Sequence, residues 1–470
     1  MTLHRISRRT VLRTGAGLLA AGTLPASALE NSVFDVIVAG SGAGGFAAAI
    51  RASENGASVL LLEAADWLGG ASRVATGIFG CAGHPIQKAL GFTATPDDLY
   101  KRYIGTAAAT HTEADPKTAR ILADGAIPAA DWLESLGVTR SRKKAKKFFL
   151  NIKEGHRLGE LLIDSLEKRA QALKVDIRTR HRAVRLIAQD GRIRGIVCET
   201  PAGEKRFAAK AVVLATGGFE NNPEMVAKYI GGGWEKAKVY CTPTNRGDGQ
   251  RMAEATGAAL DDMEVFKANP TVLTFKGNRI NMIKAVRAGA FAVSQRGERF
   301  MNELGGYWQS RRLWALPEKS AWLIFGDPVL KADHRFPGLS KEGAFKSASS
   351  LKELAAKIGV PGNELEKSAK AYLEAAASGK DEAFGRPNPV NPFGGKYFAA
   401  KFEPMIQGTF GGVRADAKTR VLSVSGKAIP GLYAVGECAA NGLRGVNPQT
   451  ANAVFGSIAG REAAAFAKEN

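Results

Sequence analysis

The stretch from Val33 to Glu63, VFDVIVAGSGAGGFAAAIRASENGASVLLLE, decides the fold class of this 470-residue chain. An apolar run leads directly into Gly40-x-Gly42-x-x-Gly45, and an alanine-rich segment and a second apolar run follow, ending in Glu63. A strand, a glycine turn, a helix and a second strand ending in an acid are typical of a dinucleotide-binding unit. The three glycines permit the tight turn, the approach of a pyrophosphate and close packing of helix on strand. The stretch therefore predicts a Rossmann-like domain.

Further glycine-rich motifs follow this unit in a fixed order. AADWLGGASRVATG comes directly after Glu63, and AVVLATGGFENN (211–222), IPGLYAVGECAANGLRG (429–445) and NPQTANAVFGSIAGREAA (447–464) come later. In these motifs the chain resembles the superfamily of FAD-dependent fumarate reductases, urocanate reductases and 3-ketosteroid dehydrogenases, in a short form without a haem or FMN domain. NAD and FAD share the first fingerprint, so it is the resemblance that implies FAD as the cofactor.

The resemblance also implies which residues hold FAD. They lie in the first glycine loop, the acid that follows it, the second glycine loop, position 184, the ATGG turn and the closing motifs. The expected set is Gly40, Gly42, Ala43, Gly44, Gly45, Glu63, Ala64, Gly69, Gly70, Ala71, Ser72, Thr76, Gly77, Val184, Ala215, Thr216, Gly217, Gly436, Glu437 and Asn447.

Strand and helix patterns alternate before Asn222 and again after about Asn391, which predicts an α/β fold with a parallel sheet. The resemblance implies a discontinuous Rossmann-like FAD-binding domain with an inserted α+β capping domain. We expect residues 29–222 to form the first part of the FAD-binding domain, 223–390 the substrate cap and 391–470 the second part. Caps of this kind exclude water from the substrate.

The first 28 residues have the pattern of an export signal. Arg8 and Arg9 precede a short apolar run and the small-residue site Ala26-Ser27-Ala28, which predicts a twin-arginine signal peptide and a periplasmic protein. The apolar run is shorter than the roughly 20 residues that a spanning helix needs, so we expect no membrane span.

The net charge of +20 raises the question of nucleic acid, but only one dense basic run exists, Arg140 to Lys147. No nucleic-acid motif accompanies it, so we expect no nucleic-acid partner. The run is either a solvated face or a docking patch for an acidic electron-transfer protein.

The four cysteines form no C-x-x-C pair, which argues against bound haem c, an iron–sulfur cluster or a zinc site, and no metal site is expected. Electrons would then come from a separate molecule. We expect that donor to be a cytochrome c or a quinol-linked protein.

Motif by motif, most of the fumarate machinery is missing. The resemblance places Asn269 and Gly408 where fumarate reductases have substrate-binding histidines, and Tyr307 where they have the proton-donating arginine. In the proton-relay stretch Arg287 is retained, but Lys284 replaces the acid. A substrate other than fumarate is therefore implied.

Ketosteroid dehydrogenases carry a tyrosine at the position of Tyr307, where it exchanges a proton at the substrate carbon. A phenol can do this when a nearby cation lowers its pKa, and Arg287 or Lys284 would be that cation. The alternative is that Tyr307 only packs in the cap. Arg444 lies one position from a carboxylate-binding arginine of fumarate reductases and favours an acid substrate. The expected catalytic residues are Tyr307, Arg287 and Arg444, and the expected substrate contacts are Asn269, Thr409 and Arg444.

These observations predict an exported FAD-dependent oxidoreductase that reduces the C=C bond of an α,β-unsaturated carboxylate other than fumarate. Hydride would come from flavin N5 and the proton from Tyr307. The alternative is a dehydrogenase that introduces a C=C bond next to a carbonyl, as ketosteroid or tricarballylate dehydrogenases do. The expected partner is a small-molecule unsaturated acid or ketone. A third hypothesis is a non-catalytic electron carrier.

Overall fold

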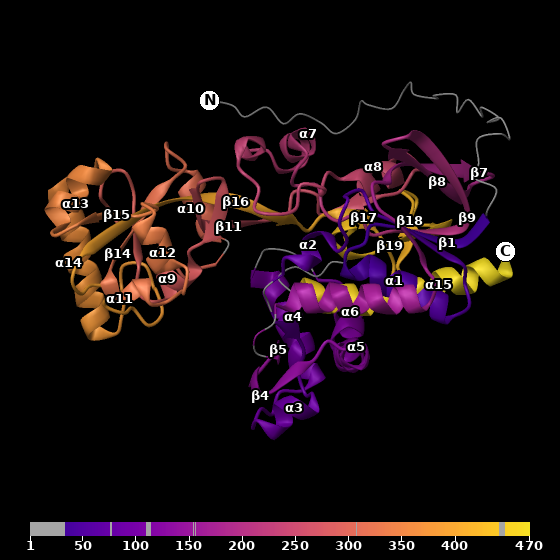
Figure 1. Cartoon of the computed structure of the whole chain (residues 1–470), viewed down its shortest axis with the longest axis horizontal. Coiled ribbons are helices and arrows are strands. Elements are labelled where there is room, and N and C mark those ends of the chain that lie inside the picture. The colour runs from indigo at the N-terminus through magenta and orange to yellow at the C-terminus, as the bar shows by residue number, and fades with distance from the viewer. Residues whose placement is uncertain are drawn as a thin grey trace, which may run out of the picture.

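The computed structural model describes residues 33–75, 78–109, 114–153, 155, 157–306, 308–440 and 447–470. Two large lobes are built on separate sheets (Figure 1). We call them the Rossmann lobe, which contains Val33, and the cap lobe, which contains Phe291.

The Rossmann lobe has a parallel sheet in the order β18-β19-β9-β1-β2-β6. Its parallel strands are β19 (Ala428–Ala434), β9 (Gly203–Leu214), β1 (Val33–Ala39), β2 (Val59–Leu62) and β6 (Asp176–Arg178). The short β18 (Arg420–Leu422) and the pair β7 (Arg182–Gln189) and β8 (Arg192–Thr200) add antiparallel strands. Since β19 comes from the end of the chain and pairs with β9, the predicted discontinuous α/β fold is confirmed.

Two helices from opposite ends of the chain pack closely on this sheet. They are α1 (Ala43–Glu54) and α15 (Pro448–Glu469), which lie together in Figure 1. A Cβ atom on Gly456 would lie 2.5 Å from the Gly44 carbonyl oxygen, and one on Gly460 would overlap the Ala48 carbonyl oxygen. The glycine and alanine content of both helices therefore permits the contact that joins the two chain ends. The helix α6 (Leu158–Ala172) packs against α1 as well.

A smaller unit projects from the Rossmann lobe (Figure 1). It contains α2 (Gly70–Arg73) at its base, α3 (Pro85–Ala89), α4 (Pro96–Ala109) and α5 (Pro116–Ser135), with a sheet in the order β3-β5-β4. These strands are β3 (Phe79–Gly80), β5 (Phe149–Ile152) and β4 (Arg140–Lys146). The basic run of the sequence thus lies on β4, at one edge of this sheet.

The cap lobe is built on an antiparallel sheet in the order β12-β11-β16-β14-β13, with β15 also paired to β16. Its strands are β11 (Phe266–Phe275), β12 (Asn278–Asn281), β13 (Phe291–Val293), β14 (Ala321–Gly326), β15 (Lys346–Ala348) and β16 (Tyr397–Thr409). Helices α9 (Ile283–Arg287), α10 (Trp308–Trp314), α11 (Asp327–Leu330), α12 (Phe336–Lys341), α13 (Leu351–Ile358) and α14 (Gly362–Ser378) cover it. The predicted boundary at 391 falls in the loop before β16, which pairs in the cap sheet although the prediction assigned it to the FAD-binding domain.

Strands β11 and β16 run between the two lobes (Figure 1). The segment before them carries α7 (Pro223–Met225), the helical turns Val226–Ile230 and Trp234–Lys236, and α8 (Asp248–Glu254). Two small strands, β10 (Leu260–Asp261) and β17 (Gly412–Arg414), pair at the ends of these connections, and β17 also pairs with β20 (Ala439–Ala440). No helix in the described part of the chain is long and apolar enough to cross a bilayer.

A buried ion cluster holds the cap lobe together. Arg299 binds Glu303 at 3.0 Å and Asp381 at 2.6 Å, and Arg386 binds Glu303 at 2.9 Å. None of the four side chains is more than 7% exposed. We call these four residues the cap ion cluster. Two of them, Arg299 and Glu303, belong to the stretch RFMNE that precedes Tyr307, so that stretch has a structural role.

Candidate active site

The glycine loop between β1 and α1 has the shape that a dinucleotide requires. Gly40 has a φ of +107°, which favours glycine, and a Cβ atom there would overlap the Ala215 carbonyl oxygen. A Cβ on Gly45 would overlap the Gly40 carbonyl oxygen, whereas one on Gly42 would have nothing nearer than Ser72 Oγ at 3.8 Å. The loop therefore packs tightly on its protein side and is open where a pyrophosphate would lie.

Glu63 anchors this loop from the end of β2. Its Oε2 accepts hydrogen bonds from Ser41 N at 3.1 Å and Ser41 Oγ at 2.6 Å, and its Oε1 accepts one from Ala65 N at 2.9 Å. Ser41 Oγ in turn accepts from Gly69 N, which ties the two glycine loops together. A carboxylate has about four lone-pair sites, so Glu63 retains capacity for a ribose hydroxyl.

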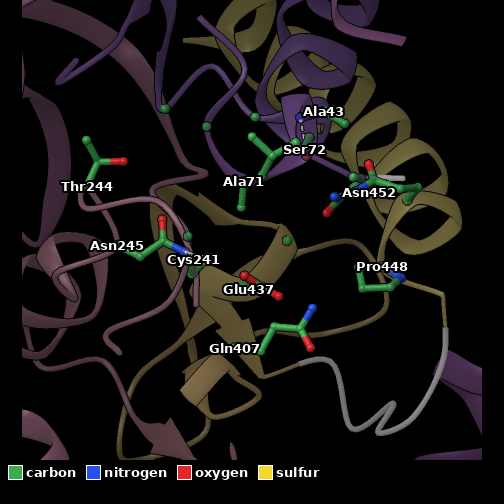
Figure 2. A pocket seen from close by; sticks show the side chains of 18 of the residues that line it. Ala43, Ala71, Ser72, Cys241, Thr244, Asn245, Gln407, Glu437, Pro448 and Asn452 are labelled. Atoms are coloured by element: carbon green, nitrogen blue, oxygen red, sulfur yellow. Dashed lines mark hydrogen bonds between the residues drawn. The ribbon is translucent and has the colours of Figure 1, made fainter. Parts of the chain in front are cut away.

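The second glycine loop closes over the first. Ser72, in α2, accepts a hydrogen bond from Ala43 N at 3.1 Å, as the dashed line in Figure 2 shows. At the far end of the chain Asn447 caps α15, since its Oδ1 accepts from Gln449 N and Thr450 N. The amino end of α15 thus faces the same space with its positive dipole.

These elements border a cavity of about 1030 Å³ between the two lobes. From the Rossmann lobe the predicted residues on its wall are Gly40, Gly42, Ala43, Gly44, Gly45, Glu63, Ala64, Gly70, Ala71, Ser72, Ala215, Thr216, Gly217, Gly436, Glu437 and Asn447. Gly69 is bonded to Ser41 behind the wall, and the half-buried Val184 is next to Ala183, which does line the cavity. Thr76 and Gly77 lie outside the described residues. A cavity at the large end of the usual range for cofactor sites fits a dinucleotide with room for a substrate.

Comparison with known proteins identifies the family. The model of the FAD binding domain matches residues 35–454. The chain belongs to this family of FAD-dependent oxidoreductases. It is 33% identical over 465 residues to a fumarate reductase (cytochrome) of Shewanella frigidimarina, covering 95% of this chain and 79% of that protein.

Two further likenesses support the assignment. A urocanate reductase of Eggerthella lenta is 30% identical, over 92% of this chain and 75% of that protein. A solved structure, the open conformation of a flavocytochrome c3 fumarate reductase, superposes with a TM-score of 0.82 at 32% identity, over 93% of this chain and 79% of that one. The predicted superfamily and FAD as cofactor are thereby confirmed, and the enzyme belongs to the FAD-dependent oxidoreductases that act on carbon–carbon double bonds. When bound, FAD supplies the hydride for such a reaction.

None of the predicted catalytic and substrate residues that the structure describes lines this cavity. Tyr307 and Arg444 lie outside the described residues. Arg287 is exposed at the end of α9 and does not line the cavity. Asn269 and Thr409 are buried behind the wall, where Asn269 Oδ1 accepts from Thr271 N and Thr409 Oγ1 accepts from Phe219 N. The roles proposed for these five residues remain predictions.

The cap lobe contributes a cationic wall, of which the motifs had singled out only Lys284. Lys267, Arg279, Lys284 and Arg335 all line the cavity, and Asp333 is the only carboxylate that the described part of the cap lobe adds. Asp333 accepts two hydrogen bonds from the Arg335 guanidinium, at 3.0 and 2.8 Å, and lies 3.3 Å from Lys284 Nζ. The Arg335 guanidinium, above all, lowers the pKa of Asp333. This wall therefore has a net positive charge.

Glu437 stands on the opposite wall, near Gln407, Cys241 and Asn245 (Figure 2). It is half-buried, and burial together with the nearby Glu220 raises its pKa to about 8, although Lys267 acts in the other direction. Burial also raises the pKa of Glu220. A predicted cofactor contact is thus also a titratable group. The motif VGEC contains Glu437, but nothing in it indicates that Glu220 lies nearby.

One other group of side chains has the composition of a metal site, His84, Asp131 and Glu134. His84 Nδ1 accepts a hydrogen bond from Ile86 N, and this bond places the ring proton on Nε2, which lies 3.0 Å from Asp131 Oδ1. Both ring nitrogens are therefore in use within the protein. Because His84 caps α3 in this way, we assign it a structural role.

Proposed function

We propose that this enzyme reduces the C=C bond of an α,β-unsaturated carboxylate other than fumarate. The observation that carries the proposal is the cavity itself, in which the FAD cradle faces a cap wall with Lys267, Arg279, Lys284 and Arg335. Guanidinium and ammonium groups recognise carboxylates. Relatives named for fumarate and urocanate both act on unsaturated acids, which supports the same substrate class here.

The following roles in binding and catalysis are proposed for residues of this chain. The cationic wall holds the carboxylate, and closure of the cap lobe excludes water from the reacting carbons. Tyr307 donates the proton at the carbon next to the carboxylate, and Arg444 grips the carboxylate, both roles resting on the motif comparison. Among the described residues Tyr240 lines the cavity, and burial raises its pKa, which keeps its proton in place at neutral pH.

The test is an anaerobic reoxidation experiment. The bound flavin is reduced chemically and mixed with unsaturated acids and their amides, and recovery of the oxidised absorbance is followed. We expect an acid to react and its amide to react at least tenfold more slowly. Tyr307→Phe should slow the reaction by about 10² to 10⁴-fold, and Arg444→Ala should raise the KM for the acid.

Two further tyrosine variants serve as a control and as a test of an alternative proton donor. Tyr397→Phe removes a hydroxyl from β16 that does not line the cavity and should leave the rate unchanged. Tyr240→Phe tests the competing tyrosine, and a loss of rate there but not in Tyr307→Phe would move the proton donor to Tyr240. If saturated acids or ketones bleach the oxidised enzyme while no enoate reoxidises the reduced one, the dehydrogenase alternative replaces the proposal.

We further propose that the protein is exported to the periplasm and receives electrons from a separate acidic electron-transfer protein, a cytochrome c or a quinol-linked carrier. The basic β4 supports an acidic donor. Arg142, Lys143, Lys144, Lys146 and Lys147 are exposed on it or just after it. Next to β4 in the sheet lies β5, and beyond β5 lies β3, which follows the cavity residue Ile78.

Two measurements test the donor and the location. Reduction of the flavin by an acidic flavodoxin should slow with rising salt and in a variant with Lys143, Lys146 and Lys147 changed to Gln. Reduction by dithionite should not change. Replacing Arg8 and Arg9 by Lys should retain the protein in the cytoplasm, and unchanged fractionation would contradict export by the twin-arginine route.

A further inference from the structure

We propose that Glu220 and Glu437 hold one proton between them at neutral pH, so that this wall of the cavity carries one negative charge instead of two. We call these two residues the cavity acid pair. The proposal goes beyond the assignment of Glu437 to FAD binding and gives Glu220 a role. It rests on the proposed function in one respect, that the cavity receives an anionic acid.

Two distant turns bring the acids together. Glu220 follows β9 in the turn GGFENN, and Glu437 lies in the helical turn Gly436–Cys438 after β19. Both reach the end of β16. Thr409 Oγ1 donates to Glu220 Oε2 at 3.5 Å, and a Cβ atom on the adjacent Gly408 would lie 3.2 Å from Glu437 Oε1.

The partners of Glu220 are neutral. Asn245 Nδ2 donates to its Oε1 at 2.8 Å, Thr409 donates to Oε2, and the Cys241 thiol bonds to the same carboxyl. The side chain is 2% exposed. An ionised carboxylate in such a place is costly unless a cation compensates it, and protonation is the ordinary way to avoid the cost.

Charged groups on the neighbouring elements do not remove this cost for both acids. Lys267, on β11, faces Glu437 and favours its ionised form. Cys241 remains a thiol, because burial and the two nearby acids raise its pKa. Cys438 is likewise buried, and Asp248 in α8 is bound to Arg182 at 2.9 Å. One lysine can compensate one carboxylate, and the second acid then keeps its proton.

Two acids this close titrate as a unit, since ionising one raises the pKa of the other. Burial raises the pKa of both, to about 8 for Glu437. Through neutral pH the pair and Lys267 together would then be close to neutral. A wall that stayed doubly ionised would repel the carboxylate of a substrate and the negative charge that reduced flavin gathers. Above about pH 8 the proton leaves and anion binding should weaken.

Infrared difference spectroscopy of the purified oxidised holoprotein tests the proposal without any substrate. A protonated carboxyl has a C=O stretch that an ionised one lacks. We expect this band at pH 7, and we expect it to disappear on titration through about pH 8. In E220Q and in E437Q one acid remains, and the midpoint of its band should fall by about one pH unit, because the neighbouring charge is gone.

Two further variants separate the pair from the rest of the cavity. Lys267→Met leaves both acids in place and should raise the midpoint of the band, whereas E220Q should lower it. Glu403→Gln removes a carboxyl that lies on β16 and is bound to Lys238, and should leave the band unchanged. Absence of the band at pH 7 overturns the proposal, and so does a midpoint that neither E220Q nor Lys267→Met moves.

The kinetic consequence is tested separately, with an acid that proves reactive and its amide. The KM for the acid should rise at least several-fold above about pH 8 while the KM for the amide stays flat. In E220Q the rise should occur at lower pH. If no enoate reacts at all, the proposed function fails, but the infrared titration still decides whether the pair holds a proton.

Discussion

Two acid pairs in this molecule differ in how their charge is compensated. In the cap ion cluster Glu303 and Asp381 face Arg299 and Arg386, so two anions meet two guanidinium groups. In the cavity acid pair two carboxyls face one lysine and neutral partners. Burial alone would raise the pKa of Asp381, yet its hydrogen bond to Arg299 makes the net shift downward, whereas the pKa of both cavity acids is raised.

The difference shows why motif letters alone do not reveal function. The stretch GERFMNE resembles an active-site motif of the superfamily, but its Arg299 and Glu303 are buried in an ion pair that connects to Asp381. Buried charges that are compensated in this way have a structural role. Uncompensated acids beside a cavity persist at a cost, and such sites are enriched in functional groups.

The largest expected effect is on the cap ion cluster. Glu303→Gln leaves two buried guanidinium groups with one carboxylate and should lower the free energy of unfolding by about 3 to 5 kcal/mol. Urea titration followed by circular dichroism measures this. Glu220→Gln, a buried substitution of the same kind, should cost less than about 1 kcal/mol or stabilise the protein. Equal losses in the two variants would end the distinction between the pairs.

A second prediction concerns alkaline pH. The pKa of Glu437 in the folded protein, about 8, is above its ordinary value of 4.5. Its contribution to stability is therefore fully present below pH 4.5 and is lost as the pH rises through 8. Relative to wild type, Glu437→Gln should gain on the order of 1 to 2 kcal/mol between these limits, since cavity water screens part of the effect. Thermal unfolding measured across this range shows the gain, and parallel curves would contradict it.

The third prediction has the opposite sign. The pKa of Asp381 is below its ordinary value of 3.8, so its contribution is present above pH 3.8 and is lost as the pH falls through the lowered value. Asp381→Asn should cost about 1 to 3 kcal/mol at neutral pH, and its disadvantage should shrink in acid. Unfolding midpoints measured at neutral and acid pH decide this, since a constant difference would mean that Asp381 is not held ionised by Arg299.

The smallest effect is expected for a half-exposed ion pair. Glu403 binds Lys238 at 2.6 Å, and the two side chains are 29% and 48% exposed. Glu403→Gln should change the free energy of unfolding by at most about 1 kcal/mol, with salt reducing even that. A cost close to that of Glu303→Gln would show that burial is not what separates strong from weak pairs here.

The sequence by itself determined the fold class and the family, and it predicted the glycine loops that line the cavity. Gly40, Gly42 and Gly45 act through local backbone geometry, so their spacing predicts the loop wherever it occurs. The order of later motifs predicted that β19 and α15 return to the first unit, because the flavin loops must meet around one cofactor. A local sequence pattern of this kind is enough to predict the local structure that it forms.

Only the tertiary structure decided the charge environment of the site. Glu220 and Glu437 are 217 residues apart in the sequence, and nothing in either motif says that they meet at the end of β16. The cationic wall likewise combines Lys267, Arg279, Lys284 and Arg335 from separate elements. Electrostatic energy depends on distance and burial in space, and both are set by packing between segments that the sequence leaves far apart.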